Sequence, residues 1–149
     1  MASPFPSAPD KTTDKIKTLE ELAGMVKSRQ AAGETVVFTN GVFDLLHVGH
    51  ARYLAEARAL GDALLVAVNA DESVRGFKGD LRPIVPLAER MEMLAALACV
   101  DYVTPFGTRT PVPLIEVLRP APMGERGGHL QHGKGHERDY PSGAAGGGP

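Results

Sequence analysis

The chain has 149 residues, 43% of them hydrophobic, and a formal net charge of -2 at pH 7. These values allow one domain with a sizeable core, and they exclude a wholly disordered chain and the basic surface of a nucleic-acid-binding protein. No apolar run approaches the roughly 18 residues of a membrane span, the N-terminus has no signal-peptide core, and the single cysteine, Cys99, fits a reducing compartment, so we expect a cytoplasmic protein.

The N-terminal part is expected to contain a leader, a helix and a strand. Residues 1–14 are rich in proline and small polar side chains and are expected to be flexible. Thr18 and Glu21 have the spacing of a capping box, which predicts a helix that begins after Thr18 and ends at Gly33. Residues 35–39 form a β-branched run, TVVFT, before an Asn-Gly pair, and this pattern is typical of a buried strand.

The middle of the chain repeats this alternation. A second helix is predicted to follow the next loop and to end at Gly61. Residues 63–69, ALLVAVN, are a second buried-strand pattern, and residues 70–86 are expected to be a polar stretch rich in charge and glycine. The buried side of the second helix is expected to contain Ala51, Leu54, Ala55 and Ala59.

A third helix, a third strand and a fourth helix complete the predicted domain, residues 15–120. Residues 101–106, DYVTPF, form the strand, and Pro111 or Pro113 opens a helix that Pro120 ends. The third helix is expected to bury a stripe of Leu87, Met91, Leu94, Ala95 and Ala98.

Strands that alternate with helices imply an α/β fold, namely a Rossmann-like parallel sheet with helices on both faces. In such sheets, ligands bind beyond the carboxyl ends of the strands. We therefore expect a site in the loops after Thr39, Asn69 and Phe106.

The loop before the second helix carries the residues best suited to chemistry. His47 and His50 are three positions apart where the loop becomes a helix, which places two imidazoles beside N–H groups that favour phosphate. Two such donors can stabilise the charge that develops during in-line displacement at phosphorus. Gly41 and Gly49 allow the backbone close to a bulky anion, and Asp44 could orient a histidine or hold Mg²⁺ through water. The alternative is a loop that merely packs two histidines.

The string GVFDLLHVGH, residues 41–50, resembles the G-x-F-D-x-x-H-x-G-H motif of the cytidylyltransferase-like nucleotidyltransferases. The resemblance runs from about Lys15 to Pro120 and includes VNADESVR, RPIVPLAER and LIEVLRP. Within this HxGH type, the chain is most similar to the adenylyltransferase domain of bacterial ADP-heptose synthesis, which acts on D-glycero-β-D-manno-heptose 1-phosphate.

This resemblance implies roles for the residues that match the family. His47, His50 and Lys78 would be catalytic, with Lys78 on a mobile loop whose hinges are Gly76 and Gly79. From the residues alone, a loop lysine such as Lys78 is usually only a solvated charge. Arg90 could be an exposed helical residue, and Asn69 could cap a following helix. The nucleotide and substrate pocket would contain Thr39, Asn40, Gly41, Phe43, Asp44, Gly49, Asn69, Asp71 and Arg90.

The implied reaction moves AMP from ATP to a sugar 1-phosphate, giving an ADP-sugar and pyrophosphate for lipopolysaccharide-type precursors. Mg²⁺ would be held mainly by the phosphates of ATP, and no dedicated metal ligands are expected. The alternatives are a cytidylyltransferase for glycerol 3-phosphate or ethanolamine phosphate, a non-catalytic nucleotide-binding domain, and an aminoacyl-tRNA synthetase fragment, which the absence of a KMSKS-like segment disfavours. A homo-oligomer and a separate sugar kinase are compatible with the sequence.

The sequence changes character after Pro120. Residues 121–149 hold nine of the 17 glycines, and Leu130 is their only Val, Ile or Leu, so we expect this segment to be disordered. The family pattern would place a strand and a Lys-Gly-Gly-Asp loop there. Reading Met123-Gly124 one base forward gives tryptophan and permits that loop to follow, which suggests a frameshift and a missing last strand. A natural, divergent tail is the alternative.

Overall fold

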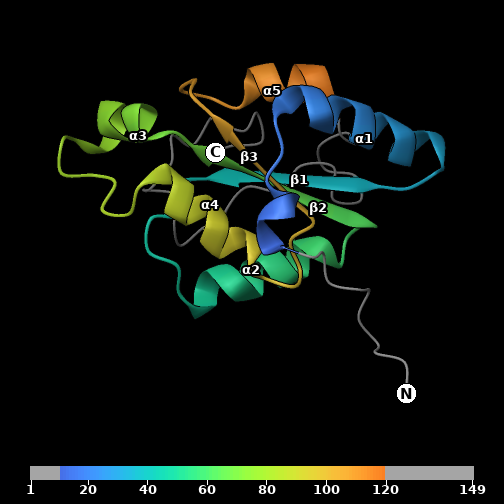
Figure 1. Ribbon diagram of the computed structural model, residues 1–149, viewed down its shortest axis with the longest axis horizontal. Helices are drawn as coiled ribbons and strands as arrows, with labels where there is room; N and C mark the ends of the chain where they lie inside the picture. The colour runs from blue at the N-terminus through green and yellow to red at the C-terminus, as the bar shows by residue number, and fades with distance from the viewer. Residues whose placement is uncertain (1–10, 120–149) are drawn as a thin grey trace.

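The computed structural model of the protein describes residues 11–119. Helices and strands alternate through this part of the chain (Figure 1), as the sequence predicted. The elements are the 3-10 helix η1 (Thr12–Lys15), α1 (Leu19–Ala31), β1 (Val36–Gly41), α2 (Val48–Arg58), β2 (Ala63–Asn69), α3 (Asp71–Lys78), α4 (Leu87–Ala95), β3 (Tyr102–Phe106) and α5 (Val112–Leu118).

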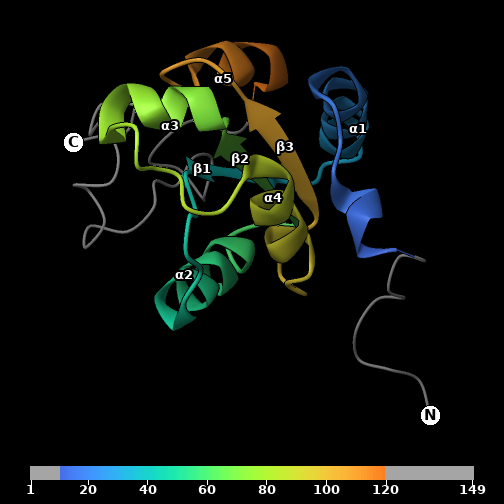
Figure 2. The ribbon, with the colours of Figure 1, turned by 60° about the vertical axis from the view of Figure 1, so that its left-hand side comes forward.

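The three strands form one parallel sheet in the order β1-β2-β3. Val36 of β1 lies opposite Ala63 of β2, and Leu65 of β2 lies opposite Tyr102 of β3. Helices α1 and α5 cover one face of the sheet, and α2 and α4 cover the other (Figures 1 and 2). The predicted Rossmann-like sheet with helices on both faces is therefore confirmed.

Alternate residues of each strand contribute to two separate cores, because successive side chains point to opposite faces of a sheet. Every residue of β1 and β2 is buried, which explains why neither strand shows the regular alternation of apolar and polar residues that a half-buried strand has. The core beneath α1 and α5 includes Leu22, Val26, Phe38, Leu65, Leu114 and Leu118. The core beneath α2 and α4 includes Val37, Phe43, Leu54, Val66, Leu94 and Val103.

Part of the predicted leader is structured. Thr12–Lys15 form η1, and Lys15 Nζ donates a hydrogen bond to Leu97 O at 3.1 Å. Ile16 then bridges to Val103 in parallel, next to the edge strand β3. Residues 1–10 and 120–149 lie outside the described residues, so the expectations for the leader, the tail and the last strand remain expectations.

The predicted ends of helices and strands agree best with the structure where they depend on residues close together in the sequence. Thr18 Oγ1 accepts from Glu21 N at 3.2 Å, and Glu21 Oε1 accepts from Thr18 N at 3.0 Å, so the capping box of α1 is confirmed. Gly33 follows the helix with φ +83°. Strand β1 is longer than predicted, because Asn40 and Gly41 belong to it.

The buried side of α2 differs from the prediction. His50, Leu54 and Ala57 are buried, whereas Ala55 and Ala59 are exposed. Alanine suits both buried and exposed helical positions, so a pattern built on alanines does not identify the buried face. Ala98 is likewise exposed, beyond the end of α4.

Residues 70–86 are not a loop throughout. Asp71–Lys78 form α3, with Val74 as its buried residue, and Gly79 ends the helix at φ +93°. Gly76 lies within α3, so its predicted role as a hinge is wrong. The alternative that a helix follows Asn69 is therefore confirmed, although its N-cap residue is Ala70. None of the helices within residues 11–119 is long and apolar enough to cross a membrane.

Candidate active site

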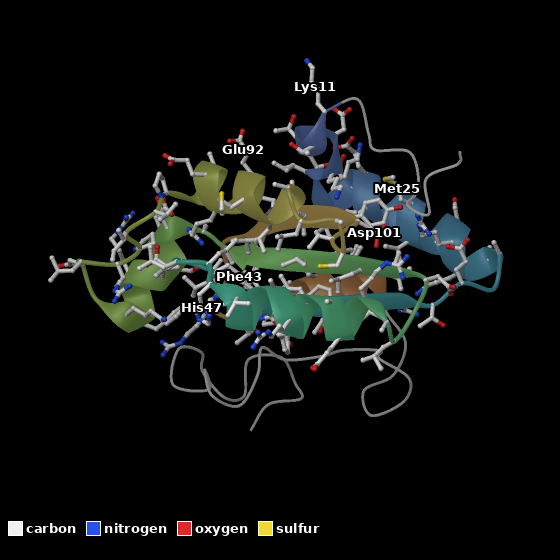
Figure 3. All side chains as sticks on the ribbon, turned by 90° about the horizontal axis from the view of Figure 1, so that it is seen from below. Lys11, Met25, Phe43, His47, Glu92 and Asp101 are labelled. Atoms are coloured by element: carbon white, nitrogen blue, oxygen red, sulfur yellow. The ribbon has the colours of Figure 1, made fainter. Side chains whose placement is uncertain are left out.

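The loops that follow β1 and β2 meet at the carboxyl end of the sheet. Figure 3 shows Phe43 and His47 close together beside the start of α2, away from Asp101. This is the position at which ligands bind in open parallel sheets. The predicted location of the histidine loop is therefore confirmed.

His47 and His50 cap the first turn of α2. His47 is the N-cap residue, and its Nδ1 accepts from Gly49 N at 3.0 Å. His50 Nδ1 accepts from His47 N at 3.2 Å, and the two ring centroids lie 4.1 Å apart. Because each Nδ1 accepts a hydrogen bond, each neutral ring carries its proton on Nε2, where it can donate. The predicted placement of two imidazoles at a helix start is confirmed.

These hydrogen bonds occupy backbone N–H groups in the first turn of α2, where a helix usually binds an anion. Gly49 N donates to His47 Nδ1, and His50 N donates to His47 O at 3.0 Å. Both N–H groups would otherwise be available to a phosphate at the helix start. The cap therefore engages backbone N–H groups that an anion would otherwise contact.

Gly49 makes room for the ring of His47. A Cβ atom at Gly49 would lie 2.7 Å from His47 Cε1 and 2.9 Å from His47 Nδ1, which is closer than real Cβ atoms approach. A larger residue would displace the ring from its cap position. The structure adds this reason to the predicted one, the close approach of a bulky anion, which remains a prediction.

The last residues of β1 are buried beneath the site. Thr39 is 0% exposed, and its Oγ1 lies 2.9 Å from the hydroxyl of Tyr53 on α2. Burial raises the pKa of Tyr53, so its hydroxyl stays protonated at neutral pH. Thr39 thus joins β1 to α2, and its predicted part in shaping the nucleotide pocket remains a prediction. Asn40 and Gly41 are also buried, and contact with a nucleotide remains a prediction for them.

Asp44 fastens the segment between α3 and α4. Its carboxylate accepts from Ile84 N at 2.9 Å, Val85 N at 2.8 Å and Arg82 Nη1 at 3.2 Å. Burial alone would raise the pKa of Asp44, but these donors outweigh it and lower the pKa below its ordinary value. The prediction that Asp44 orients a histidine is therefore wrong, because its partners lie in this distant segment.

Arg90 is buried among protein partners, and its predicted contact with a ligand remains a prediction. Its side chain is 0% exposed, and its guanidinium donates to the carbonyl oxygens of Val42, Asn69 and Val85, each at 2.8 Å. It also donates to Asp71 Oδ1 at 2.6 Å. A buried charge needs such a complete set of partners. Arg90 therefore joins the ends of β1 and β2 to α3 and to the segment before α4.

Asn69 and Asp71 lie on either side of the start of α3. Asn69 is 2% exposed and its Nδ2 donates to Ser73 Oγ at 3.4 Å, but the N-cap residue of α3 is Ala70. Asp71 Oδ1 accepts from Leu87 N at 3.0 Å, which links α3 to α4. Both residues therefore have structural partners, and their contact with substrate remains a prediction.

Lys78 is the last residue of α3. Lys78 is half-buried and directly precedes Gly79, which ends the helix with a positive φ. Of the two predicted hinge glycines, only Gly79 therefore lies at a helix end. The predicted glycine-flanked mobile loop is thus replaced by a helix end. Its role at the phosphates remains a prediction.

An apolar groove of about 150 Å³ opens beside the histidines. Val48 is 60% exposed and Met93 is 56% exposed at this groove. Sequence reasoning did not find it, because its walls come from two helices that are not adjacent in the chain. The lining residues are Leu46, His47, Val48, His50, Ala51, Met93 and Leu97.

The described residues do not form a preformed metal site. Within residues 11–119, there is no group of three His, Cys, Asp or Glu side chains that could hold a metal ion. The carboxylate of Asp44 already accepts hydrogen bonds from three residues. Binding of Mg²⁺ together with ATP, with or without a contact from Asp44, remains a prediction.

Comparisons with known proteins agree with this geometry. The chain matches the Cytidylyltransferase-like family over residues 38–131. It is 50% identical over 119 residues to the bifunctional protein HldE of Geobacter metallireducens, and 60% identical over 101 residues to that of Hydrogenovibrio crunogenus. These alignments cover 80% and 68% of this chain but 24% and 21% of the relatives, so the chain spans about a quarter of their length.

A solved structure is similar as well. The lipopolysaccharide core biosynthesis protein from Thermoplasma volcanium has a TM-score of 0.54 and 32% sequence identity, covering 58% of this chain and 70% of that chain. The family match spans more than half of the chain and includes β1, the histidine loop and α2. The chain therefore belongs to the cytidylyltransferase-like family.

Proposed function

We propose that the chain is a nucleotidyltransferase that moves AMP from ATP to a heptose-type sugar 1-phosphate, giving an ADP-sugar and pyrophosphate. The observation that carries the proposal is the pair of imidazoles at the start of α2, each with Nδ1 engaged as an acceptor and the proton on Nε2. The likeness to a lipopolysaccharide core biosynthesis protein and to HldE proteins supports a sugar-phosphate acceptor.

The reaction needs no protein nucleophile. A phosphate oxygen of the sugar 1-phosphate attacks the α-phosphorus of ATP, and the bond from that phosphorus to the leaving pyrophosphate oxygen breaks in line. The Nε2–H groups of His47 and His50 donate to the phosphate oxygens on which negative charge grows. The mutual hydrogen bonds of the cap hold both donors in place before substrate binds, so little reorganisation accompanies the reaction.

Lys78 is proposed as a further phosphate contact. It ends α3 at the carboxyl end of the sheet, where a flexible ammonium can reach an anion. We expect Lys78→Ala to raise the KM for ATP and to leave a residual activity that depends less on salt. An unchanged KM and an unchanged salt dependence would remove Lys78 from the site.

Pyrophosphate release is the direct test of the reaction. The full chain is mixed with Mg²⁺, ATP and D-glycero-β-D-manno-heptose 1-phosphate, and matched reactions replace ATP by CTP or the sugar by glycerol 3-phosphate or ethanolamine phosphate. We expect release with ATP and the heptose phosphate. Release only with CTP and one of the smaller phosphates would support the cytidylyltransferase alternative.

A thermal-shift series separates an enzyme from a binding domain. Ligands that bind the native state raise the midpoint of unfolding to an extent that grows with their affinity. Stabilisation by ATP with no pyrophosphate release under any condition would indicate a nucleotide-binding domain. A separate sugar kinase is the class of enzyme that would supply the sugar 1-phosphate.

We propose that the segment after Pro120 limits the activity of the chain. The codons of this segment provide a second test. Sequencing the gene shows whether the plus-one frame from Met123 encodes the Lys-Gly-Gly-Asp run. If it does, a protein made from that frame should release pyrophosphate faster than the 149-residue chain. An early stop codon in that frame would end the frameshift hypothesis.

A further inference from the structure

Phe43 has an unusual backbone conformation for a large, buried residue. Within residues 11–119, Phe43 and Arg119 are the non-glycine residues with positive φ, at 52° and 47°. Arg119 lies at the end of α5, whereas Phe43 is 2% exposed inside the core beneath α2. The left-handed region is strained for a residue with a Cβ atom, and it persists where surrounding contacts hold it.

Contacts on both sides of Phe43 hold this conformation. The carbonyl oxygen of Val42 accepts from Arg90 Nη1 at 2.8 Å, which fixes the peptide plane before Phe43. On the other side, Asp44 Oδ1 accepts from Val85 N at 2.8 Å. Arg90 Nε donates to Val85 O at 2.8 Å, so the same residue joins both contacts. Val42, Arg90, Val85 and Asp44 thus form a closed clamp around Phe43.

The ring of Phe43 lies against His50. The two ring centroids are 5.7 Å apart with an interplanar angle of 59°, within the range of favourable aromatic pairs. His50 is itself 7% exposed, and its Nδ1 accepts from His47 N. The contacts of the His50 ring thus include the hydrogen bond at Nδ1, the ring of His47 and the ring of Phe43.

We propose that Phe43 is a positioning residue for His50, held in its left-handed conformation by the clamp of Arg90, Val85 and Asp44. Arg90 and Asp44 thereby act on the site without touching substrate. Releasing the clamp lets the backbone of Phe43 leave the left-handed region and withdraws its ring from His50. The kinetic part of this inference rests on the proposed function, whereas the orientation of the ring does not.

The test follows the ring nitrogens of His50 by long-range ¹H–¹⁵N NMR on the full chain, at a pH where the imidazoles are neutral. In the parent we expect one tautomer, with the proton on Nε2. Phe43→Leu keeps an apolar side chain but removes the aromatic ring, and we expect His50 to show a mixture of tautomers. A folded Phe43→Leu protein with the parent tautomer pattern would overturn the proposal.

A second pair of variants tests the clamp. Asp44→Ala removes the acceptor for Val85 N and should give the same mixture, whereas Asp44→Asn retains an amide oxygen in place of Oδ1 and should keep the parent pattern. Equal spectra for the two Asp44 variants would contradict the clamp. Phe38→Leu is the matched control, because Phe38 is 1% exposed in the core on the opposite face and should leave His50 unchanged.

Kinetics add an independent readout. We expect Phe43→Leu to lower kcat by about tenfold while KM for ATP changes by less than about twofold, because a mispositioned donor acts on the transition state. A change in KM alone would assign Phe43 to nucleotide binding and overturn its positioning role. If neither the parent nor the protein made from the plus-one frame releases pyrophosphate, the proposed function fails, and the NMR spectra still decide the role of Phe43.

Discussion

Two glycines at opposite ends of the sheet show how differently those ends are used. At the carboxyl end, a Cβ at Gly49 would lie 2.7 Å from the imidazole of His47. At the amino end, a Cβ at Gly61 would lie 2.7 Å from Thr35 O and 2.8 Å from Val37 Cγ2. Gly49 therefore makes room for a side chain that can do chemistry, whereas Gly61 makes room for the backbone of the sheet.

Acidic residues differ between the two ends in the same way. At the amino end, Asp62 Oδ2 accepts from Thr35 N, and Asp101 Oδ2 accepts from Leu64 N, each at 2.7 Å. These bonds fix the starts of strands. At the carboxyl end, Asp44 and Asp71 hold the segments around α3, which border the site. The acidic residues at the amino end therefore stabilise the strands, and those at the carboxyl end stabilise the loops.

The largest expected effect is the loss of a histidine donor. His47→Asn removes the imidazole but retains a side chain that is favourable at an N-cap, so helix α2 should persist. We expect turnover to fall by about 100-fold or more, as when a transition-state donor is lost, and stability to change by less than about 1 kcal/mol. Pyrophosphate release and urea unfolding measure the two effects. A loss of turnover below about threefold would show that His47 is not a catalytic donor.

The two glycines allow a paired experiment. Gly49→Ala should displace the His47 ring and lower kcat by about tenfold, with little loss of stability because the ring can rotate away. Gly61→Ala should lower stability by about 1–3 kcal/mol through backbone crowding, with kcat unchanged in the folded fraction. Unfolding curves and kcat are measured for both proteins. If both variants were less stable but kept the parent kcat, Gly49 would have the same purely structural role as Gly61.

Thr104 tests the region between the two ends. It is 0% exposed on β3, and its Oγ1 has no hydrogen-bond partner among the described residues. Valine has the same shape without the hydroxyl, so Thr104→Val should raise the free energy of unfolding by about 1 kcal/mol. Denaturant unfolding measures this change. A loss of stability would indicate that the hydroxyl has a partner such as a buried water.

The smallest expected effect concerns Asp44 and pH. Because its pKa in the folded protein is lowered, Asp44 contributes stability above its unfolded value near 3.8, and that contribution is lost as the pH falls through the folded value. Asp44→Asn does not titrate, so the stability difference between the parent and this variant should shrink in acid below that range. Unfolding curves across acidic pH measure it. A difference that stays constant with pH would show that the carboxylate of Asp44 is not stabilised by its charge.

The sequence by itself determined the features that depend on near neighbours. The capping box of α1 needs residues three positions apart. The limits of β2 were predicted because six apolar residues followed by Asn69 suit a strand buried on both faces. The pairing of His47 and His50 at a helix start is also local, since residues three apart share one side of a helix.

The tertiary structure alone decided which polar residues turn inward. Arg90 binds carbonyl groups 48 and 21 positions away, and Asp44 binds N–H groups about 40 positions away. These partners are not visible in a local pattern of the sequence, so Arg90 was predicted only as a pocket residue, and Asp44 as a pocket residue that orients a histidine or holds Mg²⁺. A charged group that is buried away from water must be paired with polar groups that the fold brings near it, because an unpaired buried charge or polar group costs free energy. Those partners exist only where the carboxyl ends of β1 and β2 meet the segments around α3.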